Sequence, residues 1–264
     1  MKFSILGPVE VETDTGEKVT PQALKVRSLL GMLCMHAEHV ISPARLIGAL
    51  WDETPPRTAA AALQVYISQL RAGFLRAGAS PALITTTPSG YTMRLCGHAL
   101  DLALFESSAA GAEQAVHAGR PLEAARLMSE SLALWRGPAL ADVRTTPSLD
   151  GYAQQLDERR NALHEQRLNL ELRLGRHAQL IGELYGLVQE HPMWENVHSN
   201  LMIALYRSGR IPECLAAYQR IRRTLQEELG MEPCSRLRNL HGAILAREPW
   251  LDDHTRPLTS AYAS

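Results

Sequence analysis

The sequence predicts a mainly α-helical protein with a small β component, in which a mixed domain is followed by an all-helical one. Three observations indicate this fold class. Apolar residues recur at helical spacing through most of the chain, segments of alternating polarity open and close the first 98 residues, and Gly-Arg pairs recur between the later helical runs. We expect domains at residues 1–98 and 99–250, and a disordered tail at residues 251–264.

The first domain begins and ends with β structure. The segments "KFSILGPVEVET" and "GEKVT" alternate in polarity and are broken by Gly7-Pro8 and by Asp14-Thr15-Gly16, which predicts small antiparallel strands. Near residue 90, "LITTTPSGYTMRL" contains two alternating segments around Pro88-Ser89-Gly90. This pattern predicts a β-hairpin.

Three helices are predicted between these β segments. Thr20-Pro21 and Ser42-Pro43 each combine a capping residue with a proline of the first turn, and they open a helix of about residues 21–34 and the short helix "PARLIGALW". A third helix covers residues 58–78. Its apolar residues step by three and four and should face the core: Ala59, Leu63, Ile67, Leu70 and Phe74. A sheet, three helices and a terminal hairpin, in this order, predict a winged helix.

The second domain contains a helical repeat. Gly-Arg turns occur at Gly119-Arg120, Gly175-Arg176 and Gly209-Arg210, and the last two are 34 residues apart (209 − 175). This spacing is typical of tetratricopeptide repeats, in which stacked helical pairs bury a shared core and leave a surface for partners. The alternative is that the helical array only stiffens or dimerises the protein.

The distribution of charge favours the first domain as the one that meets a polyanion. Residues 1–98 hold nine Lys/Arg against seven Asp/Glu (9 − 7 = +2), and the remainder holds 18 against 21 (18 − 21 = −3). The excess is small. Any attraction to nucleic acid would therefore have to come from particular side chains and not from the net charge.

Several other classes of protein are not indicated. No apolar stretch approaches the ~20 residues that span a bilayer, and no signal peptide is evident, so we expect a cytoplasmic protein. The four cysteines lie far apart, and Cys34, His36 and His39 lack the second half of a metal site. Neither a phosphate-binding loop nor a catalytic arrangement of side chains is present. We expect no metal, no cofactor and no catalytic residue, and hence no enzyme.

The chain resembles a known family over residues 1 to about 250. The run from "LGPVEVETDTGEKVT" to "ISPARLIGALW", followed by "PPRT", "LQVYISQLR" and "TPSGYTMRL", resembles the OmpR/PhoB-type DNA-binding domain of Streptomyces antibiotic regulatory proteins. "LWRGPALADV", "LGRHAQLIGELYGLVQEHP" and "ALYRSGRIPECLAAYQRIRRTLQEELGMEP" are similar to the bacterial transcriptional activation domain of that family. Several long motifs agree in order, which is more specific than one short pattern.

The resemblance implies that residues 58–78 form the helix that enters the major groove. The base edges would be met by Ala62, Val65 and Gln69, because Gln pairs with adenine and Ala or Val contacts a thymine methyl group. The expected phosphate contacts, or neighbours of phosphates, are Lys25, Arg27, Arg45, Arg57, Tyr66, Ser68 and Arg71. The expected wing residues are Thr87, Ser89, Gly90, Tyr91 and Arg94.

Two of these residues have an alternative role. Tyr66 could equally be a half-buried ring that packs beside Leu63, and Arg71 could be a solvated charge, although a phosphate contact is favoured. We expect Arg71→Ala to weaken binding to all sequences and to flatten the salt dependence. Gln69→Ala should relax the preference at one base step by about 1 to 3 kcal/mol.

Two departures from the family pattern concern affinity. Thr87 stands where many relatives carry an arginine before the wing turn, and Ala60, Gln69 and Ala72 stand where many have more arginine. We therefore expect one copy to bind weakly and to need a second copy on repeated sites, or help from polymerase.

The resemblance implies an activator that binds direct repeats in double-stranded promoter DNA, associates with the nucleoid, recruits RNA polymerase holoenzyme and switches on a secondary-metabolite (antibiotic) gene cluster in an actinomycete. The alternative is a protein-interaction adaptor whose winged helix has weak or lost DNA affinity. A third hypothesis, an enzyme or small-molecule receptor with a pocket in the helical repeats, depends on aromatic residues such as Trp135, Trp194 and Tyr206, which are more often core.

Overall fold

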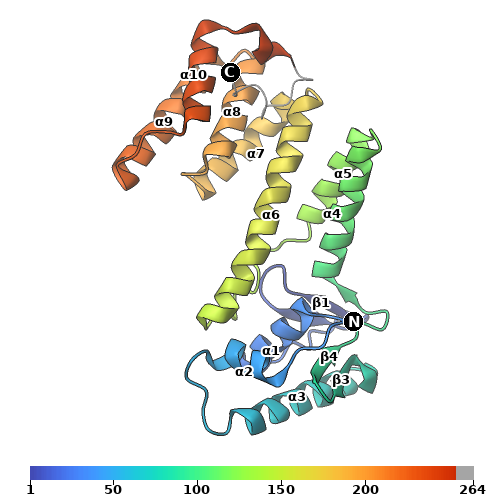
Figure 1. Cartoon of the computed structure of the whole chain (residues 1–264). Helices are drawn as coiled ribbons and strands as arrows, with labels where there is room; N and C mark the ends of the chain where they lie inside the picture. The colour runs from blue at the N-terminus through green and yellow to red at the C-terminus, as the bar shows by residue number, and fades with distance from the viewer. Residues whose placement is uncertain (254–264) are drawn as a thin grey trace. The chain divides into compact units, whose positions relative to one another are not determined.

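The computed structural model describes residues 1–253 and confirms a mainly α-helical protein with a small β component (Figure 1). The strands are β1 (Lys2–Ser4), β2 (Glu10–Glu12), β3 (Ile84–Thr87), β4 (Gly90–Met93) and β5 (Ala99–Leu100). The α-helices are α1 (Leu24–Met35), α2 (Pro43–Trp51), α3 (Ala59–Arg76), α4 (Asp101–His117), α5 (Pro121–Leu132), α6 (Pro147–Arg173), α7 (His177–Glu190), α8 (Glu195–Arg207), α9 (Ile211–Leu229) and α10 (Ser235–Ala246). Two short 3-10 helices are η1 (Pro81–Leu83) and η2 (Pro249–Asp252).

The chain forms two compact units, which we describe separately. Unit 1 contains residues 1–113 and 127–161, and unit 2 contains residues 114–126 and the chain from residue 162 on. The predicted boundary between residues 98 and 99 lies inside unit 1.

The small sheet of unit 1 has the order β2-β1-β5. β1 and β2 are antiparallel with Phe3 opposite Val11, which confirms the predicted pair, and β5 adds to β1 in parallel with Leu100 opposite Phe3. The sequence analysis missed β5, because two residues are too few to show an alternating pattern. The prediction of a strand at "GEKVT" was wrong. This segment forms only an isolated bridge, in which Lys18 pairs with Glu12.

The three helices of the winged helix occur as predicted, except at one start. α2 begins at Pro43 after Ser42, whose Oγ accepts a hydrogen bond from the Arg45 amide at 3.3 Å. α1 begins at Leu24, later than the predicted Thr20-Pro21 start. The reason is that Thr20 Oγ1 accepts a hydrogen bond from the Val11 amide at 2.9 Å, which fastens this segment to β2.

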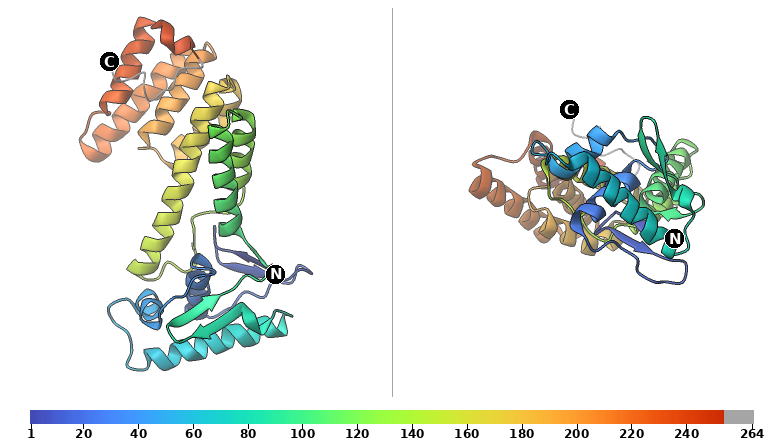
Figure 2. Two further views of the ribbon diagram at one scale, coloured as in Figure 1. Left: turned by 45° about the vertical axis from the view of Figure 1, so that its right-hand side comes forward. Right: turned by 90° about the horizontal axis from the view of Figure 1, so that it is seen from below.

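The β-hairpin lies beside α3 (Figure 2). β3 and β4 pair from Ile84 opposite Met93 to Thr87 opposite Gly90, which confirms the turn at Pro88-Ser89. Ile41, just before α2, forms an antiparallel bridge with Tyr91. The hairpin is thereby attached both to the segment before α2 and to α3.

Unit 1 also includes a segment that follows α5. Residues 133–146 cross the β1–β2 region, where the Arg136 amide donates to Leu6 O at 2.8 Å and the Leu140 amide donates to Ile5 O at 3.0 Å. The Asp142 carboxylate accepts the Val9 amide at 2.7 Å. Leu140 and Val143 are fully buried. This segment is therefore part of the core of unit 1 and not a linker.

Unit 2 contains the predicted stacked helical pairs. The predicted turns lie between α4 and α5, between α6 and α7, and between α8 and α9. Gly175 and Gly209 have φ of +77° and +74°, a conformation that glycine adopts without strain at a helix C-terminus. The 34-residue step from Gly175 to Gly209 contains one helical pair, α7 and α8. The helices share a buried cluster that includes Leu184, Leu201 and Ile221.

The end of the described chain is ordered. η2 contains Leu251, which is buried, and the Arg207 guanidinium donates to Leu251 O at 2.8 Å and to Asp253 O at 2.9 Å. The predicted disordered tail was therefore wrong at residues 251–253, and residues 254–264 lie outside the described part of the chain. Within residues 1–253, no helix combines the length and the apolarity that crossing a bilayer requires.

Candidate nucleic-acid interface

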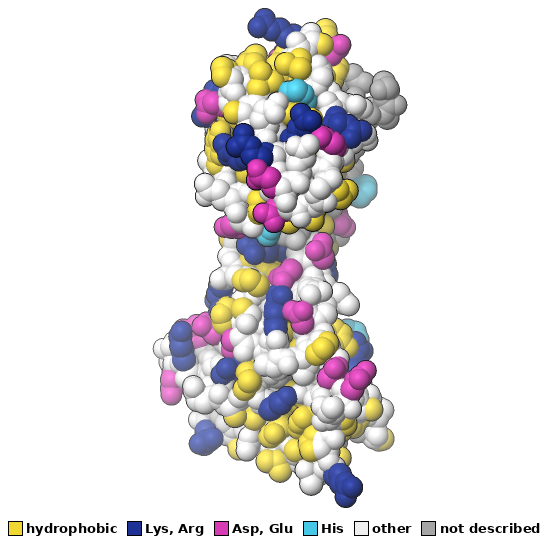
Figure 3. All heavy atoms as spheres, turned by 90° about the vertical axis from the view of Figure 1, so that its left-hand side faces the viewer, with side chains coloured by type: hydrophobic (Ala, Val, Ile, Leu, Met, Phe, Trp, Pro, Cys, Tyr) yellow, Lys and Arg dark blue, Asp and Glu magenta, His cyan; other side chains and the backbone are white. Residues whose placement is uncertain are grey.

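The outward side of α3 is an open surface without charge. The five predicted core residues of the helix, Ala59, Leu63, Ile67, Leu70 and Phe74, are all buried, which fixes the rotation of α3. The opposite side presents six small or neutral polar side chains: Ala61, Gln64, Val65, Ser68, Gln69 and Ala72. Val65 is 52% exposed. In the lower part of Figure 3, where unit 1 is drawn, hydrophobic side chains gather on the surface and Lys and Arg side chains stand apart around them.

This surface, which we call the α3 outward face, differs in part from the predicted set of base-contacting residues. Val65 and Gln69 lie on it, but Ala62 is half-buried and does not line it. Ala61 and Gln64 were missed. The i, i+4, i+7, i+11 series Ala61, Val65, Ser68 and Ala72 would have found this stripe from the spacing alone.

Ser68 belongs to the α3 outward face, although it was expected near phosphates. Its hydroxyl donates to Gln64 O at 2.9 Å, one turn earlier in the helix. That hydrogen bond satisfies the donor within the helix. The exposed oxygen still offers acceptor lone pairs at the surface.

Tyr66 packs inside unit 1 rather than standing free. Its ring stacks on that of Trp51 at the end of α2, with centroids 6.0 Å apart and 21° between the planes. Tyr66 is half-buried, as the packing alternative predicted, although its partner is Trp51. The stack fixes the spacing between α2 and α3.

Arg71 joins α3 to the hairpin. Its Nε donates to Ile84 O at 2.9 Å, and one terminal nitrogen donates to Thr86 Oγ1 at 2.8 Å. Both acceptors belong to β3. Arg71 therefore positions the wing relative to α3, a role that the sequence could not reveal because it depends on contacts across the fold.

Two of the predicted phosphate contacts are engaged in the fold. Arg27 forms an ion pair with Asp142, with 2.6 Å between Nε and Oδ2, and also donates to the carbonyl oxygens of Pro21 and Gln22. Lys25 donates to Leu50 O at the end of α2 and lies 5.8 Å from the Trp51 ring centroid. Both cations stabilise unit 1, which leaves them less free for phosphate.

Other arginines remain at the surface of unit 1. Arg57 and Arg94 are exposed, and their side chains form no hydrogen bond or ion pair with residues 1–253. Arg45 donates from Nε to the Tyr152 hydroxyl at 2.9 Å, which leaves its terminal nitrogens. Arg76 at the end of α3, absent from the predicted set, has only an Nε contact to Ala72 O at 3.2 Å.

The hairpin turn divides the predicted wing residues into exposed and buried groups. Ser89 and Arg94 are exposed and Thr87 is half-buried. Tyr91 is only 8% exposed and pairs with Ile41, so its role is to hold the hairpin. Gly90 has φ +151°, and a Cβ atom there would lie 2.0 Å from Ile41 O, so only glycine fits.

Comparisons with known proteins agree with this architecture. Residues 18–93 match the family model "Transcriptional regulatory protein, C terminal", and residues 100–245 match "Bacterial transcriptional activator domain". "Regulatory protein DnrI" of Streptomyces peucetius is 39% identical over 258 residues, covering 96% of this chain and 94% of that protein. "Regulatory protein AfsR" of Streptomyces coelicolor is 38% identical, and this chain spans 25% of its length.

A solved structure is similar over almost the whole chain. The structure "Mycobacterium tuberculosis EmbR in complex with low affinity phosphopeptide" has a TM-score of 0.87 and 34% identity, covering 98% of this chain and 68% of that one. The activator model alone matches more than half of this chain, and the match to DnrI spans nearly all of both proteins. The chain belongs to the Streptomyces antibiotic regulatory protein family of transcriptional activators.

Proposed function

We propose that this activator binds promoter DNA sequence-specifically by inserting α3 into the major groove. The observation that carries the proposal is the α3 outward face, which is exposed along the helix while the opposite stripe is buried. A major groove is wide enough for one helix, and the face presents side chains suited to base edges. Gln64 and Gln69 can each form a bidentate pair with adenine, and Val65 can contact a thymine methyl group.

The attraction to phosphate comes from the edges of the interface in this proposal. Four arginines have guanidinium nitrogens without a partner among residues 1–253: Arg57 before α3, Arg76 at its end, Arg45 on α2 and Arg94 after the hairpin. If about four of them meet phosphates, log Kd should change with log salt with a slope of about 3 to 4 in magnitude. Lys25, Arg27 and Arg71 would act by keeping α2, α3 and the hairpin in place.

The hairpin supplies the second contact with DNA. Thr87 and Ser89 lie at its turn, where their hydroxyl oxygens are 3.4 Å apart. Their small polar side chains suit a hydrogen bond to the sugar-phosphate backbone. With Thr87 at this position, the hairpin adds little charge, so binding of one copy is weak and two copies on direct repeats strengthen it.

The activating step is assigned to unit 2. The family is one of transcriptional activators, and stacked helical pairs commonly provide protein-binding surfaces. We propose that unit 2 contacts RNA polymerase holoenzyme at promoters of a secondary-metabolite (antibiotic) gene cluster. The protein would then act in the cytoplasm at the nucleoid, by binding and without catalysis or a cofactor.

The test is a variant series measured by fluorescence anisotropy on a bound promoter fragment and on random DNA. Gln69→Ala should lower the preference for the specific fragment by about 1 to 3 kcal/mol and leave random DNA unchanged. Arg57→Gln should weaken both alike and reduce the salt slope by about 1. Arg223→Gln, an exposed arginine of α9, is the matched control and should change neither.

The alternative, an adaptor with lost DNA affinity, is favoured by one observation: the α3 outward face contains no cation. Under that alternative, every fragment binds equally weakly and Gln69→Ala has no effect on selectivity. Run-off transcription with purified holoenzyme tests the activating step, since polymerase recruitment requires more transcript from the bound promoter when the protein is added.

A further inference from the structure

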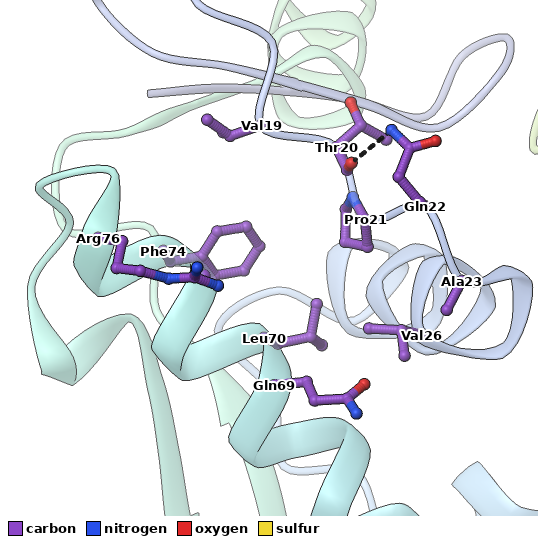
Figure 4. Close-up of a pocket in the computed structure, with 11 residues that line it drawn as sticks. Val19, Thr20, Pro21, Gln22, Ala23, Val26, Gln69, Leu70, Phe74 and Arg76 are labelled. Carbon is purple, nitrogen blue, oxygen red and sulfur yellow. Dashed lines mark hydrogen bonds between the residues drawn. The ribbon is translucent and has the colours of Figure 1, made fainter.

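A cavity of about 340 Å³ lies inside unit 1 on the edge of α3, opposite the edge that Arg71 ties to the hairpin. It is formed by the second half of α3, by residues 19–23 between β2 and α1, and by the first turn of α1. Figure 4 shows the side chains of Leu70 and Phe74 pointing from α3 toward this loop, with Val26 approaching from α1. The volume is at the lower end of the ~300–1,000 Å³ common for ligand pockets.

The floor of the cavity is apolar and fixed. Val26, Leu70 and Phe74 are each less than 5% exposed, so they are held by the core behind them. The Phe74 ring packs edge-on against Phe3, with 5.6 Å between the centroids. A rigid aromatic and aliphatic floor suits a flat apolar group, because no side chain must be reordered when such a group binds.

The rim of the cavity offers a cation and an amide. Among residues 1–253 Arg76 uses only Nε, so its two terminal nitrogens have no partner there, and their planar fork matches a carboxylate. The Gln69 amide forms no hydrogen bond with residues 1–253. An apolar floor below one guanidinium and one amide is the lining expected for an aromatic acid.

Gly73 lies between these two residues and keeps the cavity open. Gln69, Gly73 and Arg76 step by four and three, so they form one stripe of α3. Glycine lowers helix stability in such an interior position, and a Cβ atom here would meet nothing within 4 Å. The packing of the chain therefore does not require glycine at this position, whereas a ligand in the cavity would use the space that a side chain would fill.

We propose that this cavity binds an aromatic carboxylate and that its occupancy weakens specific DNA binding through Gln69. Gln69 lines both the cavity and the α3 outward face, so its amide can serve a bound acid or a base edge. Coupling of this kind is reciprocal, so bound DNA must lower the affinity for the ligand by the same factor. The coupling rests on the proposed DNA-binding function, whereas the binding of the acid does not.

Calorimetric titration of the full chain without DNA tests the site. The probes are 2-naphthoate and, as its uncharged match, 2-naphthamide. We expect 2-naphthoate to bind at least about tenfold more tightly than the amide, and Arg76→Gln to remove that difference. Gly73→Leu should abolish the binding of both probes by filling the cavity, and circular dichroism checks that this variant folds. Arg223→Gln should bind like the unsubstituted chain.

The result that overturns the site is the absence of 2-naphthoate binding, a preference for 2-naphthoate over 2-naphthamide that survives Arg76→Gln, or binding of either probe that survives Gly73→Leu. The coupling is tested by adding 2-naphthoate to anisotropy titrations: the Kd for the specific fragment should rise by a larger factor than that for random DNA, which loses only the phosphate contact of Arg76. An unchanged specific Kd with the ligand bound would overturn the coupling. Failure of the chain to select any fragment would instead refute the proposed function and leave the calorimetric result standing.

Discussion

Different kinds of contact stabilise the interior of each of the two units. In unit 1, polar groups join residues that are remote in the sequence: the Asp101 carboxylate accepts the amides of Ile5 and Leu6, and Asp142 accepts the amide of Val9. In unit 2, α8 packs against its sequence neighbours α7 and α9 around one apolar cluster. Unit 1 therefore adds long-range polar contacts to its apolar core, whereas unit 2 depends on a continuous series of local contacts.

The difference bears on where the DNA-binding part of the chain ends. The family model for the first domain ends at residue 93, yet Asp101 and residues 133–146 complete the packing around β1 and α1. A Cβ atom at Gly31 of α1 would lie 2.9 Å from Leu140. We expect the winged helix to need residues far beyond 98 for its stability.

The largest expected effect is that of Asp101→Ala. Asp101 is 3% exposed, and its carboxylate accepts backbone amides of Ile5, Leu6 and Leu102 at 2.8–2.9 Å. Removing it leaves several buried donors without a partner, at about 1–3 kcal/mol for each group. We expect the free energy of unfolding of unit 1 to fall by about 4 kcal/mol, measured by urea titration, with amide hydrogen exchange of residues 1–113 reporting on unit 1.

The matched control for this prediction is Glu158→Ala. Glu158 is an exposed carboxylate of α6 within unit 1, and its removal should be nearly neutral. If Asp101→Ala and Glu158→Ala destabilise unit 1 equally, the long-range contacts do not hold it together, and the contrast between the units is lost.

A second prediction concerns the response of unit 2 to acid. Burial lowers the pKa of His198 to about 4, and the residue is 1% exposed. Because the unfolded state binds a proton near pH 6.5, the stability that depends on neutral His198 is complete above that pH and is lost as the pH falls toward 4. Between pH 7 and pH 5 the loss should be about 2 kcal/mol.

The pKa of Asp101 in unit 1 is shifted in the opposite sense with respect to stability. Burial raises the pKa of its carboxyl group, so the contribution of this group falls as the pH rises through that pKa and is not removed by acid. Urea titrations at pH 7 and pH 5 measure both units. In unit 2 the loss between pH 7 and pH 5 should shrink by about 2 kcal/mol in His198→Gln, and the remainder includes His241, whose pKa burial also lowers. A loss that is unchanged in this variant would assign the acid sensitivity to other groups.

The smallest expected effect is that of Arg71→Met on the hairpin. Losing the hydrogen bonds to Ile84 O and Thr86 should cost about 1 kcal/mol and increase amide hydrogen exchange in β3 and β4. Arg57→Met, which removes an exposed arginine of the same unit, should leave that exchange unchanged. DNA binding separates the two roles of Arg71: a reduced salt slope indicates a phosphate contact, and an unchanged slope with weaker binding indicates that Arg71 acts by positioning the hairpin.

Local patterns in the sequence predicted the elements well. The buried stripe of α3, the Ser42-Pro43 start of α2, the Pro88-Ser89 turn and the Gly-Arg turns follow from rules that operate within a few residues. The partners of the arginines could not be predicted in this way. Arg27 meets Asp142, 115 positions away (142 − 27), and Arg71 meets a strand whose place depends on the whole fold. The number of cations in the sequence therefore does not give the number that can contact DNA, because some of them are bound within the fold.

The central claim is that a neutral helix face reads sequence while surrounding arginines supply the attraction. Its most direct test is a fluorescence-anisotropy titration of the full chain against tiled promoter fragments from its genomic neighbourhood, at several salt concentrations. We predict tight binding to one fragment, poor competition by random DNA and a log-log salt slope of about 3 to 4 in magnitude. Equal, weak binding to all fragments would contradict the claim and favour an adaptor that acts through a protein partner.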